Sequence, residues 1–161
     1  MRIVLALLLL MQAQSLPSTS RESGWHGIVP LHSNRSEVEK LLGPASETLP
    51  GAALYRTKDG AVRISYSEGT PCGTKDSHWR VPADTVIIVD VTLSPGHLLS
   101  QFNLDETKYT KKCGGHLPED VYYVSKEKGE VLRVFMGEVM DIHYGPTSSD
   151  EDLKCPPSKK P

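Results

Sequence analysis

Residues 85–93 read TVIIVDVTL, the segment of the chain richest in β-branched side chains. Such side chains favour strands because they pack well on a pleated surface. Successive residues of a strand point to opposite faces, which places four apolar residues on one face: Ile87, Val89, Val91 and Leu93. Asp90 and Thr92 lie on the other face. One polar face indicates a strand of an antiparallel sheet that is open to solvent on that side.

A hairpin is predicted before this strand. Residues 62–67 alternate apolar and polar side chains after a turn at Lys58-Asp59-Gly60, and Leu54 and Tyr55 begin the partner strand. The hairpin and residues 85–93 together predict a sheet of at least three antiparallel strands.

A capped helix is predicted ahead of the hairpin. Asn34 can accept a hydrogen bond from the free N–H groups at the helix start, and Glu37 completes a capping box. The apolar side chains within residues 38–42 recur on one helical face, and Gly43-Pro44 ends the helix. A helix of about two turns is not stable alone, so we expect it to pack on the sheet.

The same order of elements recurs in the second half of the chain. A short helix is predicted over Asp105–Lys111, a strand over Val121–Ser125, and a hairpin over Val131–Tyr144 that turns at Met136-Gly137. The predicted fold class is therefore α+β: an antiparallel sheet with one or two short helices packed on one face. The repeated order favours two tandem related halves.

A resemblance to a known family supports this fold. Residues 34–44, NRSEVEKLLGP, followed by an aromatic-bearing hairpin, resemble the SmpA/OmlA domain of the BamE-like outer-membrane assembly lipoproteins. A similar helix-plus-sheet unit occurs twice in the beta-lactamase inhibitor protein fold. The resemblance implies a helix packed on a sheet, whereas the Cys that carries the lipid after the signal of those lipoproteins has no counterpart here. Residues 79–86, WRVPADTV, are similar to a segment of an uncharacterised family of secreted bacterial proteins.

Length and composition set the domain organisation. The chain has 161 residues, 24% of them charged and 38% hydrophobic, which excludes a disordered chain and a large multi-domain enzyme. We expect one domain over residues 25–146, with halves 25–94 and 95–146. A flexible arm over 16–24 precedes it and a polar tail over 147–161 follows it. The net charge of −2 provides no basic surplus for nucleic acid or acidic lipid.

The first fifteen residues indicate export. Met1-Arg2 is a positive start, Ile3–Met11 is an unbroken apolar run, and Ala13-Gln14-Ser15 has small residues where a signal peptidase cleaves. The apolar run is too short for about 30 Å of hydrocarbon. We therefore predict a signal peptide over 1–15, a secreted or periplasmic protein, and no stable membrane insertion.

Three cysteines follow the predicted signal peptide, so an oxidising compartment allows one disulfide and leaves one thiol. Three pairings exist. Cys72–Cys155 is favoured because Cys155 lies in a proline-rich tail that needs an anchor, and Cys72 lies in the longest irregular stretch. Cys113 is then unpaired. The alternative is that all three cysteines are reduced.

Patterns typical of catalysis, cofactors and metals are absent from the sequence. It contains no Gly-x-Ser-x-Gly, no phosphate-binding loop and no dinucleotide fingerprint. Its histidines are scattered singly, unlike the closely spaced ligands of a zinc site. Only Cys113-Gly114-Gly115-His116 approaches a nucleophile and base. We predict no catalytic residue, no cofactor and no metal.

The strongest candidate site is the stretch Ser67–Asp84, which has no periodicity. Loops of this length in compact domains are usually functional or disordered. Trp79 lies beside His78 and Arg80, and Trp and Arg are enriched at the energetic centres of interfaces. These three residues are therefore the predicted partner-binding site. The alternative is that Trp79 folds back to cover the sheet, as large aromatic residues in small domains often do.

These observations favour a non-catalytic exported module that binds another exported or envelope protein. An enzyme inhibitor is the sharpest form of this hypothesis. One alternative is a cell-envelope assembly factor of SmpA/OmlA type, which the resemblance implies. Another is a small exported hydrolase, which requires titratable groups that converge in a deep pocket.

Overall fold

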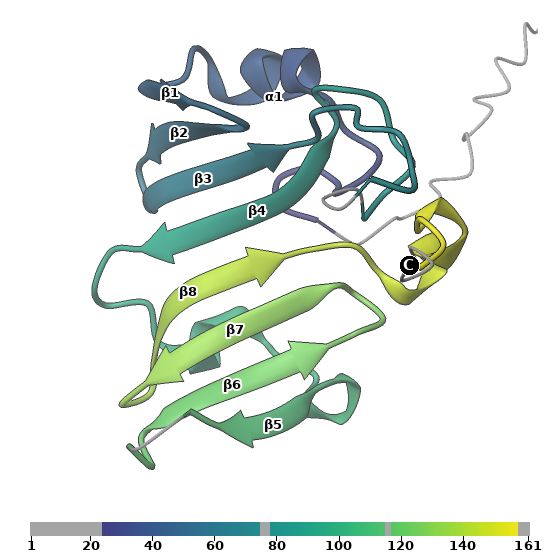
Figure 1. Ribbon diagram of the computed structural model, residues 1–161. Helices are drawn as coiled ribbons and strands as arrows, with labels where there is room; N and C mark the ends of the chain where they lie inside the picture. Colours follow the sequence, from purple (N-terminus) through teal and green to yellow (C-terminus); the bar gives the residue numbers. More distant parts are fainter. Residues whose placement is uncertain (1–23, 75–77, 115–116, 158–161) are drawn as a thin grey trace, which may run out of the picture.

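The computed structural model describes residues 24–74, 78–114 and 117–157. The predicted signal peptide, 1–15, and the arm up to residue 23 lie outside them. Figure 1 shows strands as the dominant elements of the chain. The elements follow in the order α1 (Arg35–Leu42), β1 (Glu47–Leu49), β2 (Ala52–Thr57), β3 (Gly60–Tyr66), β4 (Val86–Leu93), η1 (Leu99–Phe102), η2 (Glu106–Lys108), β5 (Thr110–Cys113), β6 (Asp120–Ser125), β7 (Glu130–Phe135), β8 (Glu138–Tyr144) and η3 (Ser148–Leu153).

The eight strands form one antiparallel sheet in the order β1-β2-β3-β4-β8-β7-β6-β5. Each half of the chain is a meander of four consecutive strands, and the last strands of the two meanders, β4 and β8, pair with each other. The prediction of an antiparallel sheet with few short helices is confirmed, although the protein is mainly sheet. The three η elements are 3-10 helices of three to six residues.

Helix α1 forms as predicted. The Asn34 side chain accepts a hydrogen bond from the Glu37 N–H at 3.1 Å, and the Glu37 carboxylate accepts one from the Asn34 N–H at 2.9 Å. Val38 is fully buried, so the helix packs this face on the core. Gly43, with a φ of 79°, ends the helix by donating its N–H to the Glu39 carbonyl.

Asn34→Ala lowers the free energy of unfolding by about 1 kcal/mol, because the Glu37 N–H of the first turn loses its capping partner. Urea denaturation followed by circular dichroism measures the loss. Ser36→Ala, an exposed change in the same helix, is the control and changes the free energy by less than about 0.5 kcal/mol. Equal effects of the two substitutions would contradict the role of the cap.

The prediction that Ile87 lies on the apolar face of β4 is wrong. The pairing of β3 with β4 passes from Ser65↔Ile88 to Tyr66↔Val86, so Ile87 has no partner and forms a bulge. Val86 is fully buried and takes the place in the core that simple alternation assigns to Ile87. Ile87 is half-buried and points to a pocket described below.

The predicted helix over Asp105–Lys111 is wrong. The Asp105 carboxylate accepts hydrogen bonds from Thr107 N–H and Oγ1, which limits the helical turn to Glu106–Lys108. The chain then becomes the edge strand β5, which pairs with β6. The predicted strand at 121–125 is confirmed as β6, and the hairpin is confirmed as β7 and β8 with its turn at Met136-Gly137.

The sheet has a covered face and an open face. The covered face carries the core and packs under α1, residues 24–33 and the segment that joins β4 to β5, which passes behind β7 and β8 in Figure 1. Its buried side chains include Val62, Ile64, Val89, Val91, Leu132, Val134 and Ile142. The open face carries the alternate residues and, in the described part of the chain, no helix crosses it. No helix in that part is long and apolar enough to cross a membrane.

Candidate binding site

The connection between β3 and β4, residues 67–84, is named the Trp79 loop here. Its base is closed by two backbone hydrogen bonds of 2.8 Å, from Ser67 N–H to the Thr85 carbonyl and from Asp84 N–H to the Ser67 carbonyl. Gly69 has a φ of 70°, and a Cβ there would lie 2.8 Å from the Ala83 nitrogen. Only glycine lets the two arms of the loop approach this closely.

The C-terminal segment, residues 147–155, holds the Trp79 loop in place. Cys72 and Cys155 form a disulfide with their Cα atoms 5.3 Å apart, which confirms the favoured pairing. The His78 carbonyl accepts a hydrogen bond from the Cys155 N–H at 2.9 Å, and the Arg80 N–H donates to the Leu153 carbonyl at 2.7 Å. The loop and the segment therefore pair like two short strands around Trp79. Cys113 is a free, exposed thiol, as predicted.

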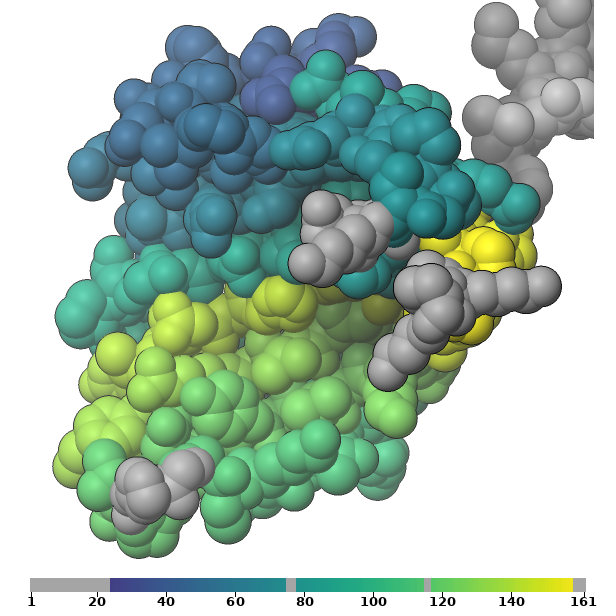
Figure 2. All heavy atoms as spheres, in the orientation of Figure 1, coloured from purple at the N-terminus to yellow at the C-terminus, as the bar shows by residue number. Residues whose placement is uncertain are grey.

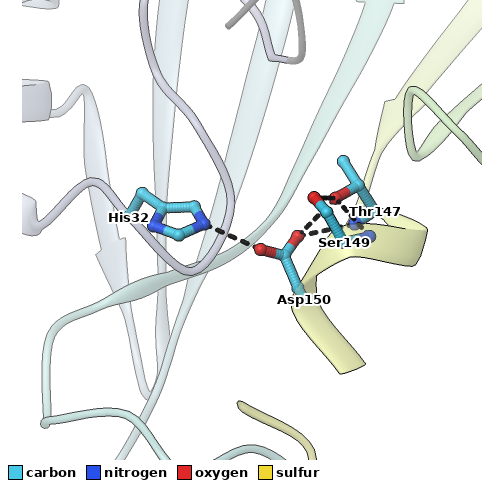
Figure 3. Close-up of polar contacts among 4 residues, drawn as sticks. All are labelled: His32, Thr147, Ser149 and Asp150. Atoms are coloured by element: carbon cyan, nitrogen blue, oxygen red, sulfur yellow. Dashed lines mark hydrogen bonds and ion pairs between the residues drawn. The ribbon is translucent and has the colours of Figure 1, made fainter. Parts of the chain in front are cut away.

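A second contact ties the C-terminal segment to the first half of the chain (Figure 3). His32 Nε2 donates to Asp150 Oδ1 at 2.7 Å, and Thr147 N–H and Oγ1 donate to Oδ2 at 2.8 and 2.7 Å. Ser149 Oγ extends the network through Thr147 Oγ1 at 2.7 Å. The polar tail predicted over 147–161 therefore contains a buried carboxylate, since Asp150 is 4% exposed.

The Asp150 carboxylate is ionised at neutral pH despite its burial. Burial alone raises the pKa of a carboxylate. Here the hydrogen bonds from Thr147 Oγ1, Thr147 N–H and His32 outweigh burial and hold the pKa of Asp150 below its ordinary value. The ionised Asp150 carboxylate caps η3, the 3-10 helix that leads into Cys155, by accepting the Thr147 N–H.

Helix α1 holds the other side of the loop. Arg35 Nε donates to Asp84 Oδ1 at 2.8 Å, and the Arg35 guanidinium lies 3.9 Å from the centre of the Tyr66 ring. The hydrogen bond to Asp84 raises the pKa of Arg35 further. Burial, together with the hydrogen bond to Tyr55, raises the pKa of Tyr66, so its phenol is neutral.

A pocket of about 340 Å³ lies between the Trp79 loop and the ends of β3 and β4. In Figure 2 the described part of the loop, residues 67–74 and 78–84, lies in teal at the end of the sheet where β3 ends and β4 begins. The pocket combines aromatic and aliphatic surface with a few polar groups, the usual composition of a ligand or side-chain site. Its lining residues are Gly51, Tyr66, Ser67, Glu68, Thr70, His78, Trp79 and Ile87.

The structure brings two of the three predicted site residues together. Trp79 is half-buried, and both Trp79 and His78 line the pocket. Arg80 is exposed but turns to the C-terminal segment, where its Nη2 donates to the Asp152 carbonyl at 2.7 Å. Two further residues line the pocket: Tyr66, a core residue that is 5% exposed, and Ile87, which alternation assigned to the apolar face of its strand. No local signal separates them from core residues, because the bulge arises only from pairing with β3.

The open face continues from the pocket as a ladder of paired charges. His143 Nδ1 donates to Asp90 Oδ1 at 2.8 Å across β8 and β4. Arg133 Nε donates to Asp120 at 3.0 Å, and its Nη1 lies 3.6 Å from Asp141. The hydrogen bond with Asp120 raises the pKa of Arg133. The His143–Asp90 pair joins the two halves of the sheet, and the pairs of Arg133 join strands within the second half.

Two findings concern chemistry other than binding. In the described ranges, no group of three or more His, Cys, Asp or Glu side chains is placed to hold a metal ion. Of the motif Cys113-Gly114-Gly115-His116, residues 115 and 116 lie outside those ranges.

Comparison of the chain with protein-family models, with curated proteins and with solved structures found no match.

Proposed function

We propose that this protein is an exported, non-catalytic binding module that recognises another exported or envelope protein through the Trp79 loop and its pocket. The observation that carries the proposal is the pocket itself, which half-buried Trp79 lines together with Tyr66 and Ile87. A partner side chain that enters it would contact two aromatic rings, the residues most often found at energetic centres of interfaces.

The bracing of the loop supports recognition with a small entropic cost. The disulfide and the Trp79↔Lys154 bridge hold the loop on one side, and the Arg35–Asp84 ion pair holds it on the other. Binding loses little freedom when the contacting residues are already held in place, as 78–80 are here. An inhibitor of an exported enzyme uses such a loop, so inhibition is the sharpest form of the proposal. The disulfide is also the kind of bond that exported proteins retain.

Trp79→Ala is expected to remove partner capture. The purified protein with its disulfide formed is immobilised and presented to the exported proteins of the organism that makes it. Truncating a central interface tryptophan costs at least about 2 kcal/mol, so recovery of the partner falls about thirtyfold. Quantitative mass spectrometry of the captured proteins measures the change.

Met136→Ala is the matched control. Met136 is an apolar side chain that is 74% exposed at the turn between β7 and β8, at the opposite end of the sheet from the loop in Figure 1. Circular dichroism establishes that both variants fold. Equal capture by Trp79→Ala and the native protein, or the absence of any captured partner, would refute the proposed site.

We also infer that residues 25–94 and 95–146 are two copies of one structural unit. About the pair Val91↔Ile142, the polar pairs Asp90↔His143 and Thr92↔Asp141 exchange places, as a two-fold axis requires. The neighbouring strands follow the same rule, since Arg63 faces Asp90 and Arg133 faces Asp141. A best superposition of the two meanders that does not place Val91 on Ile142 would contradict this inference.

A further inference from the structure

We propose that the pocket beside the Trp79 loop binds a basic side chain of the partner protein. The apolar stem of this arginine or lysine packs on Trp79 and Ile87, and its charged end binds the Glu68 carboxylate. The inference rests on the proposed function, because it names the kind of side chain that this pocket recognises.

The charge of the pocket wall is the first argument. Glu68 is the one acidic residue among the described residues that line the pocket, and no lysine or arginine is among them. Glu68 is exposed and forms no ion pair or hydrogen bond within the described ranges. Its Oε1 lies 3.9 Å from the position that a Cβ on Gly51 would take. An unpaired carboxylate therefore stands at the pocket, where it attracts a cation.

The segments around the pocket carry a surplus of negative charge. The described part of the Trp79 loop and the C-terminal segment together contain five acidic and two basic side chains. Both basic side chains are engaged, since Lys154 lies 3.6 Å from Glu151 and Arg80 donates to a backbone carbonyl of the C-terminal segment. Residues 75–77, outside the described ranges, contain one acid and one base. This surplus favours the approach of a basic partner.

The other cations near the pocket have carboxylate neighbours. The Arg35 guanidinium forms an ion pair with Asp84 at 2.8 Å. Arg63 lies three residues along β3 from Tyr66, which is about 10 Å or one Debye length, and it is opposite Asp90 in the register of β3 and β4. Neither arginine therefore presents an uncompensated positive charge that would repel a basic side chain from the pocket.

The aromatic rings suit a cation as well. The faces of Trp and Tyr rings attract ammonium and guanidinium groups, and Trp attracts them most strongly. The protein already contains this combination, because Arg35 lies 3.9 Å from the centre of the Tyr66 ring and donates to the Asp84 carboxylate. Trp79 and Glu68 offer the same two kinds of group to a basic side chain from outside. The stem of such a side chain is apolar, so it also packs on the aliphatic part of the pocket.

Apolar and acidic side chains fit the pocket less well. An apolar side chain would displace water from the Glu68 carboxylate without offering it a hydrogen bond, which costs free energy. An acidic side chain would bring a second carboxylate next to Glu68, and two like charges at one site disfavour each other. A basic side chain keeps the apolar contact and gives Glu68 a partner.

The test selects a phage-displayed library of random peptides on the purified protein with its disulfide formed. Enriched peptides are synthesised, and their affinity is measured by fluorescence anisotropy. We expect arginine or lysine to be enriched at one position, and its replacement by norleucine to weaken binding at least about tenfold. Glu68→Lys is expected to weaken binding by a similar factor, and a peptide with glutamate in place of its basic residue regains affinity for that variant.

Glu119→Lys is the matched control. Glu119 is an exposed carboxylate between β5 and β6, at the edge of the sheet remote from β3, and its replacement makes the same change in net charge. We expect it to leave the affinity within about twofold. Circular dichroism establishes that both variants fold. An equal loss of affinity in the two variants would show a response to net charge alone and would overturn the inference.

The remaining outcomes separate this inference from the proposed function. Peptides that lose binding in Trp79→Ala but have no basic position, or that bind Glu68→Lys unchanged, overturn the basic side chain and leave the Trp79 pocket as the binding site. Peptides that bind Trp79→Ala unchanged, or a library with no enrichment, overturn both.

Discussion

Replacing Cys72 and Cys155 together by serine is expected to lower the free energy of unfolding by about 4 to 5 kcal/mol. The disulfide closes a loop with a sequence separation of 83 residues, so its loss gives the unfolded chain much conformational freedom. The native state loses order as well, because residues 153–155 pair with the Trp79 loop. Guanidinium chloride denaturation under non-reducing conditions, followed by tryptophan fluorescence, measures the change.

Cys113→Ser is the control for this experiment. Cys113 is exposed and unpaired on β5, so its replacement changes the free energy of unfolding by less than about 0.5 kcal/mol. Hydrogen exchange adds a local measurement: in the double variant the amides of Arg80 and Cys155 exchange faster, while those in the centre of β4 change less. Equal stability of the double variant and Cys113→Ser would show that the disulfide does not form.

Part of the fold could be predicted because its signals are local. The cap at Asn34 and the stop at Gly43 mark both ends of α1 within ten residues of sequence, and the structure shows both. The turns at 58–60 and 136–137 likewise mark hairpins, because each places a reversal between two alternating segments. These elements need no information from distant parts of the chain.

The sequence-based predictions fail where the local structure depends on strand pairing or on competition between two local structures. Ile87 leaves the covered face because β3 and β4 shift register, which alternation along one strand does not show. The predicted helix at 105–111 fails because Asp105 caps a single turn and β6 offers the next residues a partner strand. The two halves of the sheet join because β4 pairs with β8, and these strands lie about 50 residues apart in the sequence.

The candidate site was predicted in outline only. The length of the Trp79 loop and the presence of Trp79 were visible in the sequence, and so was the favoured disulfide. The pocket was not, because Tyr66 belongs to the end of a strand and Ile87 belongs to a bulge. The contact of His32 with Asp150 joins residues 118 apart, and the acidic run gave no sign that one of its carboxylates is buried.

Asp150→Ala is expected to lower the free energy of unfolding by about 2 to 3 kcal/mol at neutral pH. The substitution removes the acceptor of His32 Nε2, Thr147 N–H and Thr147 Oγ1 at once. Breaking a fully buried charge pair costs about 3 to 5 kcal/mol. The cost is smaller here because the His32 side chain is 30% exposed, so water replaces part of the lost contact.

The effect of Asp150→Ala depends on pH in a defined direction. The pKa of Asp150 in the folded protein is below its ordinary value of 3.8, so the ionised carboxylate stabilises the fold above about pH 4. This contribution is lost as the pH falls through the folded pKa, because the protonated carboxyl no longer accepts the same hydrogen bonds. The difference in stability between the native protein and the variant therefore shrinks below pH 4.

Asp152→Ala is the matched control, since Asp152 is an exposed carboxylate two residues further along η3 and contacts Arg80 only through its backbone carbonyl. Its side chain adds little to stability, and the control changes the free energy of unfolding by less than about 0.5 kcal/mol. Urea denaturation at pH 7 and at pH 3 compares the two variants with the native protein. If both aspartate variants were equally stable at pH 7, η3 would be held by the disulfide alone, and the contact between His32 and Asp150 would have no part in positioning the Trp79 loop.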